Sequence, residues 1–146
     1  MQKQGAYILV LEINQPLELA VGSLKRIQLP AGVYAYVGSA RKGIAQRISR
    51  HKRLAEQKKG NIRWHIDYLL TYPEIRMLGS IDFEGAEECS ISHRIAALEG
   101  VSTPVPGFGS TDCRHGCKAH LYRLTQSMEH AKAVLSWNKN ATDYTD

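Results

Sequence analysis

The chain has 146 residues, which is the size of one domain and long enough to bury a continuous hydrophobic core. Its 19 lysines and arginines outnumber its 14 acidic residues and give a formal charge of +5, which favours an anionic partner such as nucleic acid over an acidic substrate. No apolar run approaches the ~18 residues that cross a bilayer. Since the N-terminus also lacks the pattern of a signal peptide, we expect no membrane association and a cytoplasmic protein.

The first third of the chain is predicted to form strands. Both alternating sets of side chains in Gly5–Ile13 are largely apolar, which predicts a central strand covered on both faces. A second extended region around Lys25–Leu29 leads through a turn at 30–32 into a third strand, Val33–Val37. Hairpin geometry would make these last two strands antiparallel neighbours.

The rest of the chain is expected to alternate between helices and short strands. Apolar residues recur at helical spacing in 44–57, which predicts an amphipathic helix. The further pattern predicts, in chain order, a buried helix over 62–70, a strand over 75–81, a helix over 85–98, a loop over 101–113, a strand over 120–124 and a helix over 126–137. Residues 1–137 would then form a single α/β (α+β) domain with a small, mainly antiparallel sheet flanked by helices. The tail, 138–146, is predicted to be disordered.

Two tyrosines, an arginine, a histidine and a glutamate are expected to gather at one edge of this sheet. If the strands of Tyr7 and Tyr36 are antiparallel, the beginning of the first and the end of the second share an edge. The following helix starts from that edge, and Arg47 and His51 project from one of its faces because they are four residues apart. Glu88 opens a later helix, in line with its apolar stripe.

Each of these residues has an ordinary explanation when it is taken alone. Tyrosines commonly fill strands, and Arg47 can be a solvated helix charge. Glu88 can cap free amides in the first helical turn, and His51 can simply pack at the helix margin. Only their combination points to chemistry.

That combination resembles a known superfamily of nucleases. GAY at Gly5–Tyr7, YVG at Tyr36–Gly38, Arg47 one turn into the next helix and Glu88 opening a later helix resemble the GIY-YIG superfamily. The motifs GVYAYVGSA, RISRH, WHIDYLL, EC and GFGSTDC followed by HL resemble its DUF123 branch over residues 5–124. The segment between the two tyrosine motifs is longer than in compact members, so we expect an added strand or loop there.

The resemblance implies a metal-dependent DNA endonuclease that hydrolyses phosphodiester bonds. Glu88 would bind Mg²⁺ or Mn²⁺, and Arg47 would hold the scissile phosphate. Tyr7 would be the general base, with Tyr36 orienting it or the water. The neighbouring Arg47 and metal ion would have to lower the tyrosine pKa from its usual value. His51 would relay a proton or bind phosphate.

Contacts to nucleic acid are expected from the turn and the basic helix. The residues assigned to them are Gly38, Ser39, Arg41, Lys42, Arg47, Arg50 and Lys52. Gly38 is expected because a side chain would obstruct the backbone where it approaches a phosphate. An alternative for the basic helix is a docking face for an acidic protein partner.

The cysteines support a different class of function. Cys113, His115, Cys117 and His120 lie within eight residues and are suitable ligands for Zn²⁺, whereas Cys89 belongs to a distant predicted helix. A zinc-stabilised, non-catalytic nucleic-acid-binding module would explain the basic charge and the cysteines without hydrolysis. Without a metal, these residues would simply be free buried thiols and loop histidines.

Overall fold

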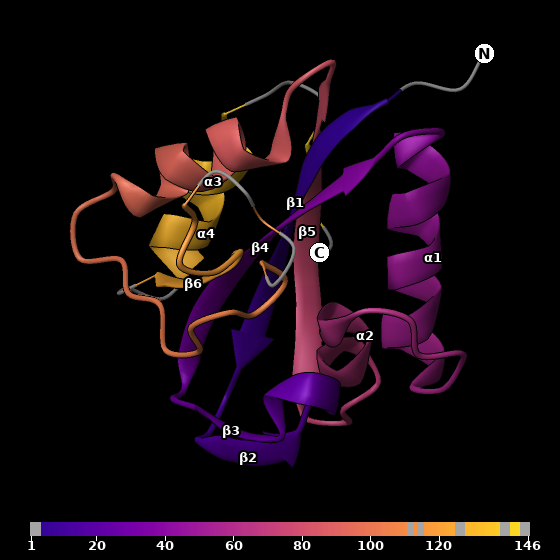
Figure 1. The fold of residues 1–146 in the computed structure, drawn as a ribbon, viewed down its shortest axis with the longest axis vertical. Coiled ribbons are helices and arrows are strands. Elements are labelled where there is room, and N and C mark those ends of the chain that lie inside the picture. The colour runs from indigo at the N-terminus through magenta and orange to yellow at the C-terminus, as the bar shows by residue number, and fades with distance from the viewer. Residues whose placement is uncertain (1–3, 111–112, 114–115, 125–127, 138–140, 144–146) are drawn as a thin grey trace.

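The computed structural model describes the chain except residues 1–3, 111–112, 114–115, 125–127, 138–140 and 144–146 (Figure 1). The described residues form two antiparallel sheets with helices around them, which confirms the predicted mixed α/β class. Among the described residues, no helix is both long and apolar enough to cross a membrane.

The main sheet has the strand order β6-β4-β1-β5-β7, and every pairing in it is antiparallel. Its strands are β1 Gly5–Ile13, β4 Gly32–Ala40, β5 Ile75–Glu84, β6 Leu121–Leu124 and β7 Thr142–Asp143. β1 lies between β4 and β5, and nearly all of its side chains are buried because both of its faces are apolar. The prediction of a central strand is therefore confirmed. Part of the tail that was predicted to be disordered forms β7, and Ala141 before it packs against a hydrophobic core; residues 138–140 and 144–146 lie outside the described ranges.

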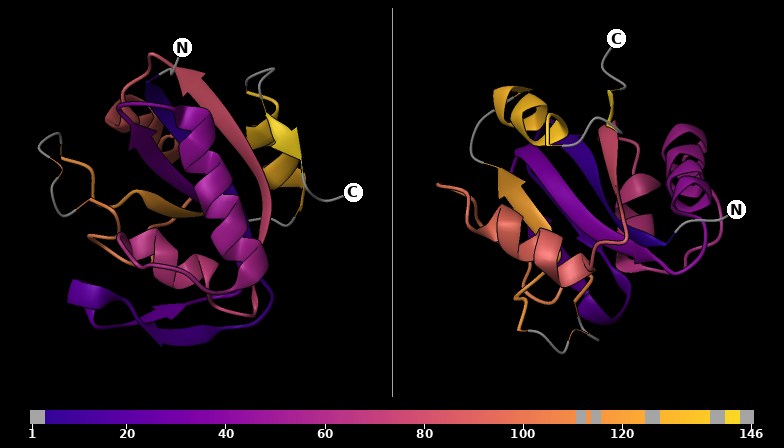
Figure 2. Two further views of the ribbon diagram at one scale, coloured as in Figure 1. Left: turned by 90° about the vertical axis from the view of Figure 1, so that its right-hand side faces the viewer. Right: turned by 90° about the horizontal axis from the view of Figure 1, so that it is seen from above.

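Helices cover both faces of the main sheet (Figure 2). On one face, α1 (Ile44–Gln57) and α2 (His65–Leu70) pack over Tyr7, Leu9 and Leu11 of β1. On the other face, α3 (Glu88–Ala96) and α4 (Met128–Leu135) share a second core with the alternate residues of that strand. The sheet thus separates two hydrophobic cores, and its edges are where side chains from both sides can meet.

The predicted hairpin between the second and third extended regions is wrong. β3 (Arg26–Leu29) pairs instead with β2 (Leu17–Ala20), a strand that the sequence analysis missed, in a separate two-stranded sheet. A short 3₁₀-helix, η1 (Gly22–Leu24), connects the two. β4 pairs along its whole length with β1, so the shorter β3 is left to its own neighbour. This small sheet lies between the two tyrosine motifs, in the segment where an added strand or loop was expected.

Lys58 ties the C-terminal end of α1 to the rest of its face. The residue adopts a left-handed conformation, with φ 58°, just after the last helical turn. Its Nζ donates to the carbonyl oxygens of Leu70 at 3.3 Å, Tyr72 at 3.0 Å and Ile75 at 2.5 Å. Leu70 ends α2, Tyr72 follows that helix and Ile75 begins β5, so one ammonium group links α1, α2 and β5.

We expect Lys58→Met to destabilise the fold by about 1–3 kcal/mol, because the three carbonyls lose their donor while the aliphatic stem is kept. The exposed neighbour provides a matched control, and Lys59→Met should change stability by less than about 0.5 kcal/mol. Urea unfolding of the two variants and the wild type measures the difference. Equal midpoints for both variants would contradict this role of Lys58.

Candidate active site

The start of β1 and the end of β4 bring the two predicted tyrosines together. In the antiparallel register Tyr7 is opposite Gly38, and Leu9 is opposite Tyr36. Both phenols therefore lie on the face covered by α1 and α2, and both line one pocket of about 400 Å³. The predicted meeting of the tyrosines, where one strand begins and its antiparallel neighbour ends, is confirmed.

The same pocket receives side chains from four further segments. The predicted site residues that line it are Tyr7, Tyr36, Ser39, Arg47 and Glu88. The sequence analysis gave no pocket role to the others, which are Arg63, Trp64, His65, Gly109, Cys113 and His120. Basic residues, aromatic rings and one carboxylate thus surround a single cavity.

His51 lies behind the pocket, where it holds the Tyr7 hydroxyl. The side chain is fully buried, and its Nε2 is 2.7 Å from the Tyr7 oxygen. Burial lowers the pKa of His51 to about 4, so the ring is neutral near pH 7 and its Nε2 can accept a hydrogen bond from the Tyr7 hydroxyl. Its Nδ1 has no hydrogen-bond partner in the described structure, and its nearest acid is Asp67, whose Oδ1 is 3.9 Å away.

Both tyrosines are kept protonated by their surroundings. Burial raises the pKa of Tyr7 well above 10, and the charge and hydrogen bonding of Arg47 lower it only in part. Burial also raises the pKa of Tyr36 well above its usual value. The protein alone therefore shifts the tyrosine pKa in the opposite direction from the one that the sequence analysis required of a general base.

Arg47 presents its charge to the pocket. Its guanidinium lies 4.3 Å from the centre of the Trp64 ring and donates to the Ser39 carbonyl at 3.2 Å. In the described part of the chain it makes no ion pair with a carboxylate. An arginine that is stacked on an aromatic ring and lacks an acidic partner is well placed to bind an anion.

Asp67 organises the loop that enters α2. The carboxylate is fully buried and accepts two hydrogen bonds from Arg50, at 3.0 and 2.9 Å, and two from the amides of Arg63 and Trp64. Burial raises the pKa of Asp67, but these hydrogen bonds more than offset it, so the pKa falls below its usual value. Arg50, which was assigned to nucleic acid, is thus directed into the protein.

Glu88 is the first residue of α3 and turns toward the pocket. The N-cap residue, Glu87, makes no side-chain capping hydrogen bond, and Glu88 is the acidic residue of the first turn, where the helix dipole also favours a negative charge. Burial raises the pKa of its carboxyl group, and a hydrogen bond with Ser39 lowers it. One carboxylate oxygen lies 3.3 Å from His120 Nδ1.

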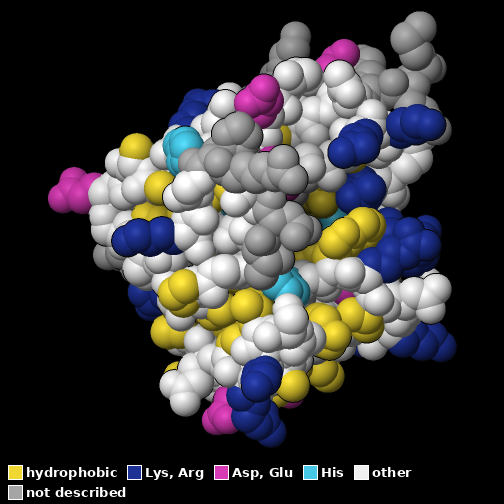
Figure 3. Space-filling view, in the orientation of Figure 1, with side chains coloured by type: hydrophobic (Ala, Val, Ile, Leu, Met, Phe, Trp, Pro, Cys, Tyr) yellow, Lys and Arg dark blue, Asp and Glu magenta, His cyan; other side chains and the backbone are white. Residues whose placement is uncertain are grey.

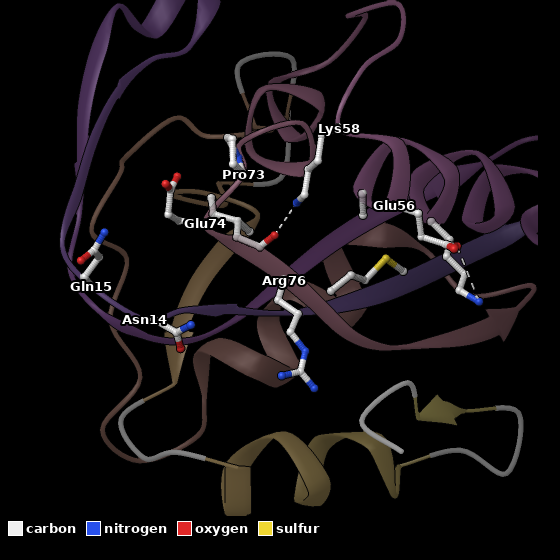
Figure 4. A pocket seen from close by; sticks show the side chains of 11 residues that line it. Asn14, Gln15, Glu56, Lys58, Pro73, Glu74 and Arg76 are labelled. Carbon is white, nitrogen blue, oxygen red and sulfur yellow. Dashed lines mark hydrogen bonds and ion pairs between the residues drawn. The ribbon is translucent and has the colours of Figure 1, made fainter.

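The remaining predicted cations are spread over the surface around α1, where lysines and arginines gather (Figure 3). Arg41 and Lys42 are exposed in the turn before the helix. Lys52 pairs with Glu56 at 3.8 Å. It lines a different, larger cavity of about 870 Å³, which Glu56 and Lys58 also line (Figure 4). None of the predicted catalytic residues is among the residues that line this second cavity.

Gly38 has a different role from the one expected. It lies within β4 rather than at a phosphate-binding turn, and a Cβ atom there would be 2.4 Å from the hydroxyl oxygen of Tyr7. The glycine therefore makes room for the phenol ring on the neighbouring strand. The structure does not support the sequence-based explanation that it keeps the backbone open to phosphate.

A second group of functional side chains adjoins the pocket. Cys89 of α3, Cys113, Cys117 and His120 place their sulfur and nitrogen atoms within 4.8 Å of one another, so this cluster can hold a metal ion. Three of the four belong to the predicted zinc group, and α3 brings in Cys89, which the sequence analysis had placed far away. His115 lies outside the described residues.

Comparison with known proteins gives the family. The family model described as "Domain of unknown function DUF123" matches residues 6–142. The chain belongs to the DUF123 family. No curated protein and no solved structure matches it. Because the DUF123 description carries no activity, the function has to be argued from the pocket.

We expect Gly38→Ala to displace the Tyr7 ring and to destabilise the fold by about 1–3 kcal/mol through overpacking. In a Tyr7→Ala background, Gly38→Ala should cost less stability than it does in the wild type, because the ring that it would clash with is gone. Denaturant unfolding of the four proteins measures the coupling. Additive effects of the two substitutions would show that the glycine and the phenol are independent.

The buried histidine predicts a pH dependence of stability. The folded-state pKa of His51, about 4, lies below its unfolded value of 6.5, so acidification favours the unfolded chain and stability falls from pH 6.5 toward pH 4. The contribution reaches about 1.4 kcal/mol per pH unit. His51→Gln should flatten this slope, whereas the exposed His93→Gln should not. Identical slopes in all three proteins would contradict a buried neutral His51.

Proposed function

We propose that this chain is a DNA endonuclease of the GIY-YIG type, which hydrolyses phosphodiester bonds with Mg²⁺ or Mn²⁺ bound at Glu88. One observation carries the proposal. Tyr7, Tyr36, Arg47 and Glu88 come from four separate elements, the strands β1 and β4 and the helices α1 and α3, and they line a single pocket. Their roles follow from their contacts.

Binding of the phosphate is assigned to arginine. A phosphodiester is anionic and repels hydroxide, so the site has to neutralise its charge. The Arg47 guanidinium, stacked on Trp64, can donate two parallel hydrogen bonds to phosphate oxygens. Arg63 is exposed at the rim of the same pocket and adds a second cation.

Glu88 is assigned to the metal ion. Mg²⁺ prefers oxygen ligands and keeps several waters, so one protein carboxylate is a sufficient anchor. The oxygen donors beside the pocket, which are the Glu88 carboxylate and the tyrosine hydroxyls, suit that preference. When bound, the ion would supply Lewis-acid activation of the phosphate and stabilise the departing oxygen.

The hydrogen bond between Tyr7 and His51 gives the proton a route. The attacking water would pass a proton to the Tyr7 oxygen while the phenol passes its own proton to His51 Nε2, 2.7 Å away. This coupled transfer avoids a free tyrosinate, which burial disfavours. The Asp67 carboxylate raises the pKa of His51, although burial outweighs this effect in the resting state, and it would stabilise the imidazolium that forms.

An alternative function is a nucleic-acid-binding module without catalysis. The raised pKa values of both tyrosines favour it, because they work against a tyrosine base. The exposed Arg41, Lys42 and Arg63 would still contact phosphates, and affinity would then fall steeply with salt. The two functions differ in whether bound DNA is cut.

The role of Glu88 is tested by Glu88→Gln, with Glu87→Gln as the matched control one residue away. Loss of the anionic ligand should lower Mg²⁺-dependent cleavage by about 10²–10³-fold, while the exposed Glu87 should be silent. DNA binding without divalent metal should be unchanged in both variants, because neither residue is assigned to the phosphate. Nicking of plasmid and cleavage of branched and single-stranded DNA provide the measurement.

Full cleavage activity in Glu88→Gln would contradict the proposed metal site. A wild-type protein that binds these DNAs but cuts none of them in Mg²⁺ or Mn²⁺ would favour the non-catalytic module. Tyr7→Phe separates the two further, since it keeps the ring and removes the hydroxyl that the proton route requires.

A further inference from the structure

The proposed hydrolysis does not use the cluster formed by Cys89, Cys113, Cys117 and His120. We propose that these residues form a structural zinc site, in which three thiolates and His120 Nε2 bind one Zn²⁺. The ion would fix the described part of the segment before β6, from which Gly109, Cys113 and His120 line the pocket. Zinc binding at this site does not depend on whether the protein cuts DNA.

The donor set is the one that zinc prefers. Three sulfurs and one imidazole nitrogen are typical of tetrahedral structural zinc sites, in which bonds of about 2.3 Å to sulfur and 2.0 Å to nitrogen place the ligand atoms roughly 3.4–3.8 Å apart. Cys89 Sγ lies 3.3 Å from Cys113 Sγ and 3.9 Å from His120 Nε2. All four ligand atoms lie within 4.8 Å of one another, so small movements would enclose a single ion. The three thiols would release their protons to solvent on binding.

Two of the four ligands are held by regular structure. Cys89 lies in the first turn of α3. His120 is almost fully buried, its amide donates to the Phe108 carbonyl at 2.8 Å, and its own carbonyl accepts from Val37 of β4 at 2.8 Å. These anchors fix half of a binding site before any ion arrives, which reduces the cost of ordering it.

The other two ligands lie in a segment that has little regular structure to hold it. Between α3 and β6 the described residues form turns and one isolated bridge, and the segment returns to the sheet at β6 (Figure 1). Cys113 lines the pocket, and Cys117 belongs to the same cluster of ligand atoms. Binding of both to an ion that is also held by α3 would cross-link this segment to the helix.

The zinc site would also orient Glu88. With Nε2 on the metal, the remaining proton of His120 is on Nδ1, a buried nitrogen with no hydrogen-bond partner in the described structure. That nitrogen is 3.3 Å from a Glu88 carboxylate oxygen. A carboxylate–histidine–zinc arrangement of this kind fixes both the tautomer and the position of the acid.

The first experiment measures metal in the purified full-length chain. We expect about one zinc per chain by elemental analysis, and stoichiometric release when the thiols are oxidised or chelator is added. Removal of the zinc should lower the melting temperature by roughly 5–10 °C if free zinc had been about a hundredfold above its dissociation constant. Zn²⁺ should restore the lost stability, whereas Mg²⁺ should not.

Variants identify the ligands. Cys89→Ser and Cys117→Ser should each lose zinc, and Co²⁺ loaded into the wild type should show thiolate-to-cobalt charge-transfer absorption that weakens in both. His93→Gln is the matched control, because His93 Nε2 lies 3.5 Å from Cys117 Sγ but does not belong to the cluster. It should keep its zinc.

Several results would overturn the proposal. A chain that takes up neither Zn²⁺ nor Co²⁺ after reduction, or one that carries iron instead, rejects a zinc site. So does a disulfide between Cys89 and Cys113 in the protein purified under reducing conditions. Loss of zinc in His93→Gln together with its retention in Cys117→Ser rejects the ligand set.

If a variant fails to fold, the zinc content and chelator response of the wild type still decide. No measurement here uses DNA, so a failure of the proposed hydrolysis is distinguishable.

Discussion

The register between β1 and β4 is the constraint on which the site depends. The two nine-residue strands pair along their whole length, from Gly5 opposite Ala40 to Ile13 opposite Gly32. A slip by one residue would turn Tyr7 to the other face of the sheet and remove the space that Gly38 leaves for its ring. Hydrophobic packing on both faces opposes such a slip, so the two cores also fix the position of the phenols.

A second constraint is the buried carboxylate of Asp67. An unpaired charge at this depth would be costly, but Arg50 and two backbone amides satisfy its oxygens. The same hydrogen bonds connect α1 with the entry to α2, which places Trp64 beneath the guanidinium of Arg47. A residue outside the pocket thus helps to set the position of the Arg47 guanidinium.

Local patterns were sufficient to predict the parts of the site that rest on periodicity. The alternation in Gly5–Ile13, the spacing of Arg47 and His51 and the start of α3 at Glu88 all follow from short-range rules. The pairing of β3 with β2 did not, because a run of four residues fits either neighbour and the choice depends on the much longer pairing of β1 with β4.

The residues that were missed depend on contacts between distant segments. Nothing in the sequence shows that Cys89 lies beside Cys113, since the path of the segment over 101–120 decides it. Arg63 and Trp64 were assigned to a helix that begins only at His65, which concealed that their amides bind Asp67. The acid in WHIDYLL, three residues after the tryptophan, is the available signal, because an acid at that spacing commonly accepts hydrogen bonds from the start of a helix.

Burial disfavours charge on the acids, phenols and imidazoles of the pocket. It raises the pKa values of Glu88, Tyr7 and Tyr36 and lowers those of His51 and His120. Arg47 adds one fixed positive charge. A divalent cation beside Glu88 would reverse the trend for the acid and the phenols, because it favours their anionic forms. Beside the fixed charge of Arg47, binding of such an ion would therefore favour the loss of protons from the acid and the phenols.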